Sequence, residues 1–204
     1  GIYSVEKFIL ARRLMYWQVY LHKTSLVAEQ LVTRLLKRAK ELIREGIKIE
    51  VSPALNYFLN STVSKKNINN ETLALFAKLD DYDIMSAMKS WQSDEDFVLR
   101  TISKMLLNRD LLRIEIQNQE FSKDKIKNAK KDLMLRFNIN ESEASYFVFT
   151  GQITNQAYSM EKETINLYTK SGKVIDVANA SDQFNLKALS KKVIKNYMCL
   201  PKTN

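Results

Sequence analysis

An unusually long helical pattern occupies about the first forty residues of this chain. Apolar residues recur every three or four positions as far as Ile43, and Gly46 follows as a helix-ending residue. Ser4 is expected to cap the start of the helix, with Glu6 in its first turn. Because the pattern exceeds the length of a typical globular helix, we expect a kink or break near Thr24–Ser25.

Short helices are predicted after this region. Their start signals are Ser52 before Pro53, Asn69 or Asn70, Asp81 or Asp83, and Ser93 with Asp96. The predicted helices end near Leu59, Leu79, Trp91 and Leu107.

The last part of the chain has a different pattern. Strands are predicted at Leu111–Ile116, Tyr146–Phe149 and Lys192–Leu200, a helix from Ser122 to about Phe137, and a hairpin of Ile165–Thr169 and Val174–Val177 around Gly172. The expected fold class is therefore α+β, with a predominantly helical N-terminal two-thirds followed by a small α+β module with a β-hairpin. We expect domains over residues 1–110 and 111–204.

Composition narrows the class of protein. At 204 residues and 45% hydrophobic content, the chain is long enough for one large or two small domains with a real core. The single cysteine, Cys199, excludes an internal disulfide and is typical of a reducing compartment, so we expect a cytoplasmic protein with a buried thiol. No apolar run approaches the roughly 20 residues that span a bilayer, so no membrane partner is expected.

The net charge of +9 comes from 32 Lys and Arg against 23 Asp and Glu. Such an excess favours polyanionic partners in general. The basic residues lie mostly at helical spacing in 34–40, 123–131 and 187–195, which is typical of solvated helix faces. No compact nucleic-acid recognition motif is present, so nucleic acid remains an alternative partner without a motif to support it.

The segment Phe8–Lys23 is the strongest candidate for a binding site. On an ideal helix Arg12, Tyr16, Tyr20 and Lys23 fall within roughly 80° of one another. Arginine binds phosphate through a fork of N–H groups, and tyrosine stacks on a base or bonds a sugar. The competing interpretation is a buried helix whose Arg and Tyr tips reach water. The only histidine, His22, points elsewhere, and a lone histidine is more often structural.

Two pieces of this segment, Glu6–Tyr16 and Val19–Thr24, resemble a particular family. They are similar to the helix that follows the last metal ligand in HD-domain phosphohydrolases, and most similar to the deoxynucleoside triphosphate triphosphohydrolase branch, which includes the human enzyme with SAM and HD domains. The resemblance implies that Arg12 holds the triphosphate, that Tyr20 contacts the sugar or base, and that Tyr16 lies between them. It also implies that His22 and Lys23 belong to a regulatory nucleotide site between subunits.

The family's metal centre is where this chain departs from the pattern. Such a centre needs several histidines and aspartates, and this chain has one histidine. The resemblance therefore implies the C-terminal part of a longer enzyme, whose N-terminal HD portion binds a divalent metal of the Mg, Mn or Fe class through residues outside this chain. We expect no metal ligands and no catalytic residues here, and Asp80–Asp83 is expected to be a solvated turn with helix-capping aspartates.

Function then follows from the resemblance. The parent enzyme is expected to be a homo-oligomer that hydrolyses deoxynucleoside triphosphates to nucleoside and triphosphate, and the isolated chain is expected to be inactive. The alternative is a non-catalytic basic module for oligomerisation or nucleic-acid binding. Its support is the charge of +9, the lack of metal ligands, and the lack of a nucleophile with an adjacent base.

Overall fold

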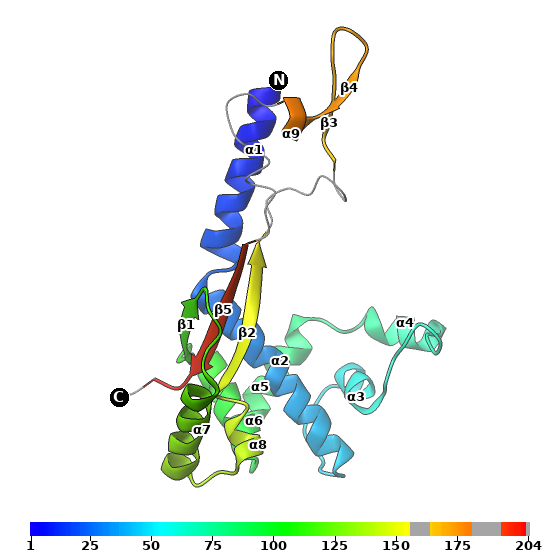
Figure 1. Ribbon diagram of the computed structural model, residues 1–204. Helices are drawn as coiled ribbons and strands as arrows, with labels where there is room; N and C mark the ends of the chain where they lie inside the picture. Colours follow the sequence, from blue (N-terminus) through cyan, green and yellow to red (C-terminus); the bar gives the residue numbers. More distant parts are fainter. Residues whose placement is uncertain (156–163, 181–192, 203–204) are drawn as a thin grey trace. The chain divides into compact units, whose positions relative to one another are not determined.

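The computed structural model describes residues 1–155, 164–180 and 193–202, and Figure 1 shows their helices and strands. The chain divides into two compact units, each assembled from segments that are distant in sequence. Unit 1 comprises Gly1–Leu26, Ile114–Lys125 and Thr150–Met198, and unit 2 comprises Val27–Arg113, Ile126–Phe149 and Cys199–Asn204. The domain boundary expected at residue 110 stays a prediction. Within the described ranges, no helix combines the length and apolar character that crossing a bilayer requires.

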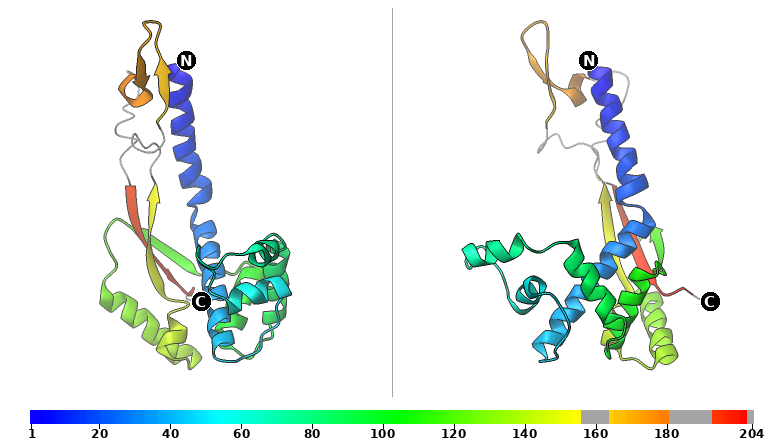
Figure 2. Two further views of the ribbon diagram at one scale, coloured as in Figure 1. Left: turned by 90° about the vertical axis from the view of Figure 1, so that its right-hand side faces the viewer. Right: turned by 180° about the vertical axis from the view of Figure 1, so that it is seen from behind.

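Unit 1 is built on the first helix, α1 (Ile2–Met15), which continues into the π-helical turn η1 (Tyr16–Tyr20). A hairpin of β3 (Asn166–Tyr168) and β4 (Val174–Asp176), followed by α9 (Val177–Ala180), lies beside the N-terminal part of α1 in both views of Figure 2. The contact is apolar: Ile9 and Val177 are fully buried, surrounded by Ile2, Val5, Ile165 and Leu167.

The turn of this hairpin depends on a glycine. Gly172 has a φ of +78°, a conformation that side chains disfavour. The Thr169 hydroxyl accepts a hydrogen bond from the Lys173 N–H at 3.1 Å and closes the turn. The hairpin predicted from the Gly172 signal is therefore confirmed.

A three-stranded sheet supplies the rest of unit 1. Its strand order is β1 (Arg113–Gln117), β5 (Val193–Leu200), β2 (Phe149–Asn155), which makes β2 an edge strand. Gly151 on β2 lies directly under the ring of Tyr197 on β5: a Cβ at position 151 would be 2.4 Å from the phenol oxygen and 2.5 Å from Cζ. The Tyr197 ring packs on β2 at Gly151, in the space that a side chain at that position would fill.

Unit 2 is helical apart from its short connections. Each short helix begins at a polar cap: Ser52, Asn69, Asp80, Asp96 and Asn140 accept backbone N–H groups in the first turn. The elements are α2 (Lys23–Arg44), which begins in unit 1, α3 (Pro53–Asn60), α4 (Asn70–Phe76), α5 (Asp81–Trp91), α6 (Phe97–Leu107), α7 (Lys123–Phe137) and α8 (Glu141–Ala144).

The apolar stripe of α2 is the centre of unit 2. Leu31, Leu35, Ala39 and Leu42 recur at helical spacing and are almost completely buried. Other fully buried side chains of this unit come from α5 and α6, and they are Trp91, Val98, Leu99 and Ile102. The predicted amphipathic character of this part of the first helical region is confirmed.

A polar network joins α2 to α6 and to the segment after α8. The Arg38 guanidinium donates to Asp96 Oδ2 at 2.7 and 3.1 Å, while Asp96 Oδ1 accepts the Leu99 N–H at 2.7 Å as the cap of α6. Arg38 also lies 3.5 Å from Glu41, which accepts a hydrogen bond from the Tyr146 hydroxyl and lies 3.9 Å from Lys37. The charged groups are satisfied by one another, which is the condition for burying them.

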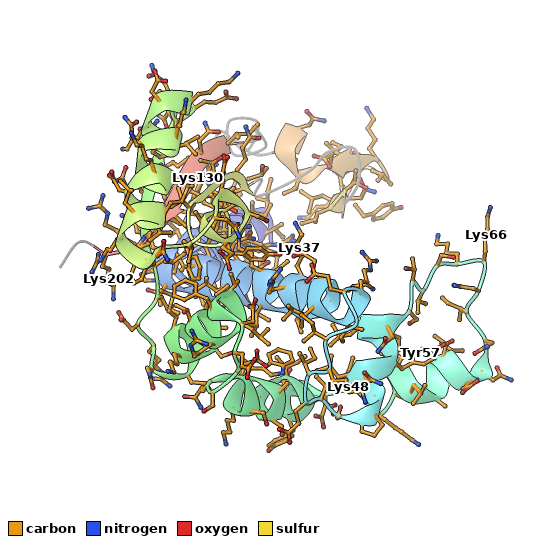
Figure 3. The ribbon with its side chains drawn as sticks, turned by 90° about the horizontal axis from the view of Figure 1, so that it is seen from below. Lys37, Lys48, Tyr57, Lys66, Lys130 and Lys202 are labelled. Carbon is orange, nitrogen blue, oxygen red and sulfur yellow. The ribbon has the colours of Figure 1, made fainter. Side chains whose placement is uncertain are left out.

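The described lysines of unit 2 are distributed over several helices and connections. Figure 3 shows labelled lysines of unit 2 on different elements, and several have nearby partners. Lys202 pairs with Asp110 at 2.7 Å, and Lys130 donates to the Ser145 hydroxyl at 2.8 Å. Most of the basic stretch 187–195 lies outside the described residues.

The structure confirms the α+β fold class and corrects four local predictions. Ser4 lies inside α1, which begins at Ile2 without a side-chain cap, and Glu6 is buried. The helix breaks at Leu21–His22, just before the expected place. Asp80 caps α5, instead of Asp81 or Asp83, because Asp83 completes a capping box from inside the helix. Residues 146–148 form a turn, and their β-rich composition reflects burial.

The sulfur of Cys199 behaves as the sequence suggested. It is a free, buried thiol on β5, and burial raises its pKa to about 12. A thiol in this state is a small apolar core group with little thiolate character.

We expect Gly151→Ala to lower the free energy of unfolding by about 1–3 kcal/mol, because the new methyl group overlaps the buried Tyr197 ring. Urea unfolding of the two single variants and of Gly151→Ala/Tyr197→Ala measures the coupling between the positions. The cost of the alanine at 151 should largely disappear once the ring is gone. Additive effects would contradict the overlap.

Stability at alkaline pH should depend on Tyr146. Burial raises the pKa of its phenol, and the hydrogen bond to Glu41 raises it further. The neutral phenol therefore stabilises the folded state below about pH 10, where an unfolded tyrosine starts to ionise, and this contribution is lost as pH rises through the folded pKa. Denaturant unfolding from pH 8 to 11 should show a steeper loss of stability for the natural chain than for Tyr146→Phe. Parallel curves would refute this.

Candidate functional site

The predicted binding residues Arg12, Tyr16 and Tyr20 form a continuous column along α1 and η1. The Arg12 guanidinium carbon lies 5.7 Å from the centre of the Tyr16 ring. The Tyr16 and Tyr20 rings are tilted by 55°, with their centres 5.1 Å apart. Cation–π and ring–ring contacts thus hold the three side chains in a fixed order.

A π-helical turn carries the two tyrosines. Its signature is the hydrogen bond from the Leu21 N–H to the Tyr16 carbonyl, 2.7 Å long and five residues back. Such turns are rare and occur frequently at functional sites. The π-turn is therefore a second reason, independent of the residue types, to regard Tyr16–Tyr20 as a candidate functional site.

The column is accessible to a ligand in this chain. Tyr16 is 38% exposed and Tyr20 is 56% exposed, so neither ring is sealed in a dry interior. Large apolar side chains beside the column are exposed as well, and they include Phe8 at 59% and Val19 at 55%. A helix with apolar side chains on most of its surface is normally buried by other polypeptide or by a membrane.

Another residue of the π-turn, Trp17, has a contact within unit 1. The Lys195 ammonium of β5 lies 5.0 Å from the centre of the Trp17 ring, which is half-buried. This contact joins residues from the two ends of the chain. Sequence reasoning missed it because no local pattern links positions so far apart.

His22 has a structural partner that the sequence did not reveal. Its carbonyl accepts the Leu26 N–H at 3.0 Å, and its Nδ1 accepts the Thr24 N–H at 3.3 Å. His22 is therefore the N-cap of α2, immediately after the break. Lys23 is exposed in the first turn of the same helix. The regulatory role expected for both residues stays a prediction.

The acidic cluster at the start of α5 is a cap. Asp80 accepts the N–H groups of Tyr82 and Asp83, and Asp83 accepts that of Asp80. A hydrogen bond from Ser52 lowers the pKa of Asp83, and the bond from the Asp80 N–H adds to the effect. Among the described residues, no group of three histidine, cysteine or acidic side chains is placed to hold a metal ion.

Unit 2 contains a pocket that sequence analysis did not predict. It has a volume of about 590 Å³ and lies where α2 ends, where the following connection begins, and along α3. Its lining residues are Ile43, Gly46, Ile47, Lys48, Ile49, Val51, Pro53, Asn56 and Asn60. None of the predicted site residues is among them.

The capping role of His22 can be separated from any ligand role. Because asparagine is also a good N-cap, we expect His22→Ala to lower the free energy of unfolding by about 1 kcal/mol and His22→Asn to have almost no effect. Thermal or urea unfolding of the chain measures both. Equal destabilisation by the two substitutions would show that the imidazole acts in another way.

Comparison with known proteins shows that this chain is similar to part of a phosphohydrolase. No protein-family model matches the chain. The crystal structure of a phosphohydrolase from Bacteroides thetaiotaomicron superposes with a TM-score of 0.90 and is 41% identical, covering 99% of this chain and 51% of that one.

Two curated proteins also match. YwfO of Bacillus subtilis is 28% identical over 188 residues, and MG461 of Mycoplasma genitalium is 24% identical over 189 residues; both are described as uncharacterized. The chain spans 41% of the length of each. The superposition covers about half of the phosphohydrolase from Bacteroides thetaiotaomicron. This chain therefore has the α+β architecture of about half of that protein.

Proposed function

We propose that this chain forms part of a metal-dependent HD-domain phosphohydrolase that hydrolyses deoxynucleoside triphosphates to nucleoside and triphosphate. In this proposal Arg12, Tyr16 and Tyr20 make one wall of the substrate site. The observation that carries it is the accessible Arg–Tyr–Tyr column, found on a chain that is 41% identical to a phosphohydrolase.

The order of the column suits a nucleotide. A nucleoside triphosphate presents base, sugar and phosphates in sequence, and the column presents two phenols followed by a guanidinium. Tyr20 would contact the base or sugar, Tyr16 would lie between, and the Arg12 fork would bind phosphate oxygens in pairs. Charge that accumulates on the triphosphate leaving group would then be neutralised by Arg12.

Other polypeptide must complete this site. Arg12 is half-buried in this chain, and a guanidinium that remains in contact with water binds phosphate weakly, because the solvent dielectric and salt screen the interaction. The exposed apolar side chains Phe8 and Val19 beside the column offer a surface on which covering polypeptide can pack and exclude water. The remaining half of the longer phosphohydrolase is the natural candidate for that cover.

The residues described in this chain do not fit a divalent metal site, since they offer no convergent set of histidines and carboxylates. In the proposal the metal of the Mg, Mn or Fe class belongs to an HD portion outside this chain. Assembly into a homo-oligomer, regulation at His22 and Lys23, and a cytoplasmic location complete the proposal.

In the full polypeptide that carries this chain, we expect Arg12→Ala to lower kcat/KM for deoxynucleoside triphosphates by about 100-fold or more, because a charge-assisted phosphate contact is lost. Arg13→Ala is the matched control, since it removes the same charge one residue further around the helix. Nucleoside release with Mg²⁺ or Mn²⁺ measures turnover, and elemental analysis checks that metal content is unchanged.

Unchanged kinetics for Arg12→Ala, or equal losses in the two variants, would remove Arg12 from the substrate site. The 204-residue chain assayed alone is expected to show no metal-dependent hydrolysis. If it is inactive and the full polypeptide is inactive as well, while the chain binds nucleic acid tightly, the alternative of a basic binding module gains the support that the enzyme loses.

A further inference from the structure

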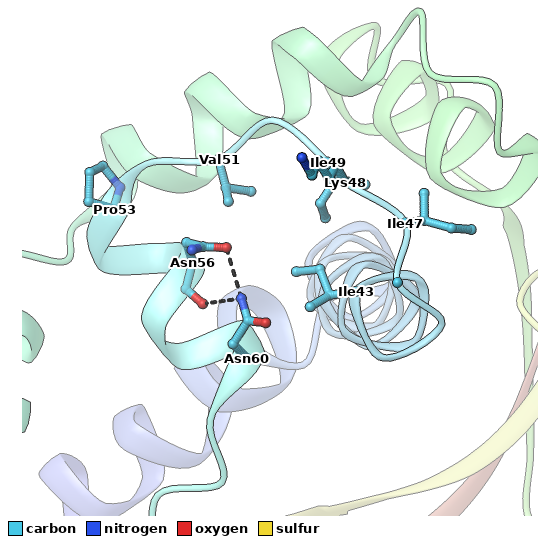
Figure 4. A pocket seen from close by; sticks show the side chains of 9 residues that line it. Ile43, Ile47, Lys48, Ile49, Val51, Pro53, Asn56 and Asn60 are labelled. Atoms are coloured by element: carbon cyan, nitrogen blue, oxygen red, sulfur yellow. Dashed lines mark hydrogen bonds between the residues drawn. The ribbon is translucent and has the colours of Figure 1, made fainter.

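The pocket of unit 2 has the form of a groove with two unlike walls. One wall is the connection Ile47–Val51, which lies outside any helix or strand, and the other is the exposed side of α3. Ile43 of α2 forms the base between them, as Figure 4 shows. All of these residues belong to unit 2.

The connection Ile47–Val51 has the composition of a β-strand without a neighbour. Its sequence alternates aliphatic and charged residues, Ile-Lys-Ile-Glu-Val, and β-branched residues favour strands. The charged residues Lys48 and Glu50 are exposed, whereas Ile49 and Val51 are half-buried. From Lys48 to Val51 this is the alternation of a strand with one face on the protein and one face in water, while Ile47 is exposed.

One edge of this connection is occupied at Glu50, and the other is open at Ile49 and Val51 but not at Ile47, whose N–H donates to the Leu42 carbonyl at 2.9 Å. The Glu50 carbonyl accepts the indole N–H of Trp91 at 2.9 Å. In an extended chain the N–H and C=O of successive residues point to opposite edges, so the groups of Ile49 and Val51 point away from Trp91. Over the part of the chain that the structure describes, neither N–H has a backbone acceptor.

The facing wall carries matching polar groups. Asn60 uses its Nδ2 to donate to both the main-chain and side-chain oxygens of Asn56, each at 2.9 Å. Among described residues, the side-chain nitrogen Nδ2 of Asn56 and the side-chain oxygen Oδ1 of Asn60 have no hydrogen-bond partner. One donor and one acceptor therefore remain available on α3, which is what the outer edge of a peptide backbone requires.

The lining also argues against a nucleotide in this groove. It contains one cation, Lys48, and no aromatic ring on which a base could stack. Four aliphatic side chains, two amides and an open backbone edge fit instead the strand-addition mode, in which main-chain hydrogen bonds give affinity and alternate side chains give specificity. The volume of about 590 Å³ is sufficient for a short extended segment.

We propose that this groove binds an extended peptide segment, which adds as an antiparallel strand to Ile47–Val51. Its aliphatic residues would alternate with a basic residue opposite Glu50 and an acidic residue opposite Lys48, because cross-strand pairs of opposite charge are favourable and like charges are not. Read from its N-terminus, the bound segment has the pattern aliphatic, basic, aliphatic, acidic, aliphatic. This inference is independent of the proposed hydrolase activity.

Fluorescence anisotropy with two labelled peptides tests the proposal. One peptide is Ser-Ile-Lys-Ile-Glu-Val-Ser, and the other has its Lys and Glu exchanged. We expect the first to bind about fivefold more tightly, since two cross-strand charge pairs change sign between the peptides. The variant Lys48→Glu/Glu50→Lys should reverse this preference while leaving the fold unchanged.

Two further measurements address the backbone. Methylating the central isoleucine nitrogen of the first peptide removes one main-chain donor without altering the protein, and it should abolish most of the binding. Asn56→Ala/Asn60→Ala should weaken binding about tenfold through lost hydrogen bonds, and Asn128→Ala on the exposed surface of α7 is the matched control that should not.

Several results would overturn the proposal. They are no binding of either peptide, equal or stronger binding of the exchanged peptide, a preference that the double charge variant leaves unreversed, and full binding of the methylated peptide. Circular dichroism of each variant ensures that a loss of binding does not come from a loss of fold.

Discussion

Burial of the α2 stripe is the constraint on which unit 2 depends. Leu31, Leu35 and Leu42 are removed from water almost completely, and the same unit buries Trp91 of α5 and Val98, Leu99 and Ile102 of α6. Burial of this kind is the main favourable term in folding, but it does not by itself fix how helices are oriented. The network of Arg38 with Asp96 adds direction, because Asp96 must cap α6 and meet the guanidinium at the same time.

Local signals in the sequence predicted much of the fold. The predicted start signals were Ser52, Asn69 or Asn70, Ser93 with Asp96, and Ser122. The structure has caps at Ser52, Asn69, Asp96 and Ser122, and such signals can be recognised because the capping interaction involves residues only two or three positions apart. Predictions failed where distant residues decide the outcome. The turn that begins at Tyr146 has a strand-like composition, yet its residues are buried by tertiary contacts, and Ser4 is inside α1 because that helix packs against the C-terminal hairpin.

In the candidate site, too, features that depend on local spacing could be predicted from the sequence, and features that depend on distant residues could not. The Arg12, Tyr16 and Tyr20 column could be predicted because helical spacing alone brings the three side chains together. The cap at His22 and the Trp17 contact with Lys195 could not, since the first needs the position of the helix break and the second needs the sheet. The groove beside Ile49 was also missed, because a strand without a neighbour is indistinguishable from a loop until its surroundings are known.

The π-turn at Tyr16–Tyr20 has a consequence for how this segment tolerates length changes. A π-turn accommodates one residue more than an α-helical turn would, so its register depends on an effective insertion. Deleting a single residue there would let ordinary α-helical bonding resume and would leave the direction of Arg12 almost unchanged, whereas the same deletion within the α-helical part of α1 would rotate everything upstream by about 100°. Two homologues that differ by one residue at this point would thus present the same face of the helix, one with a π-turn and the other without it.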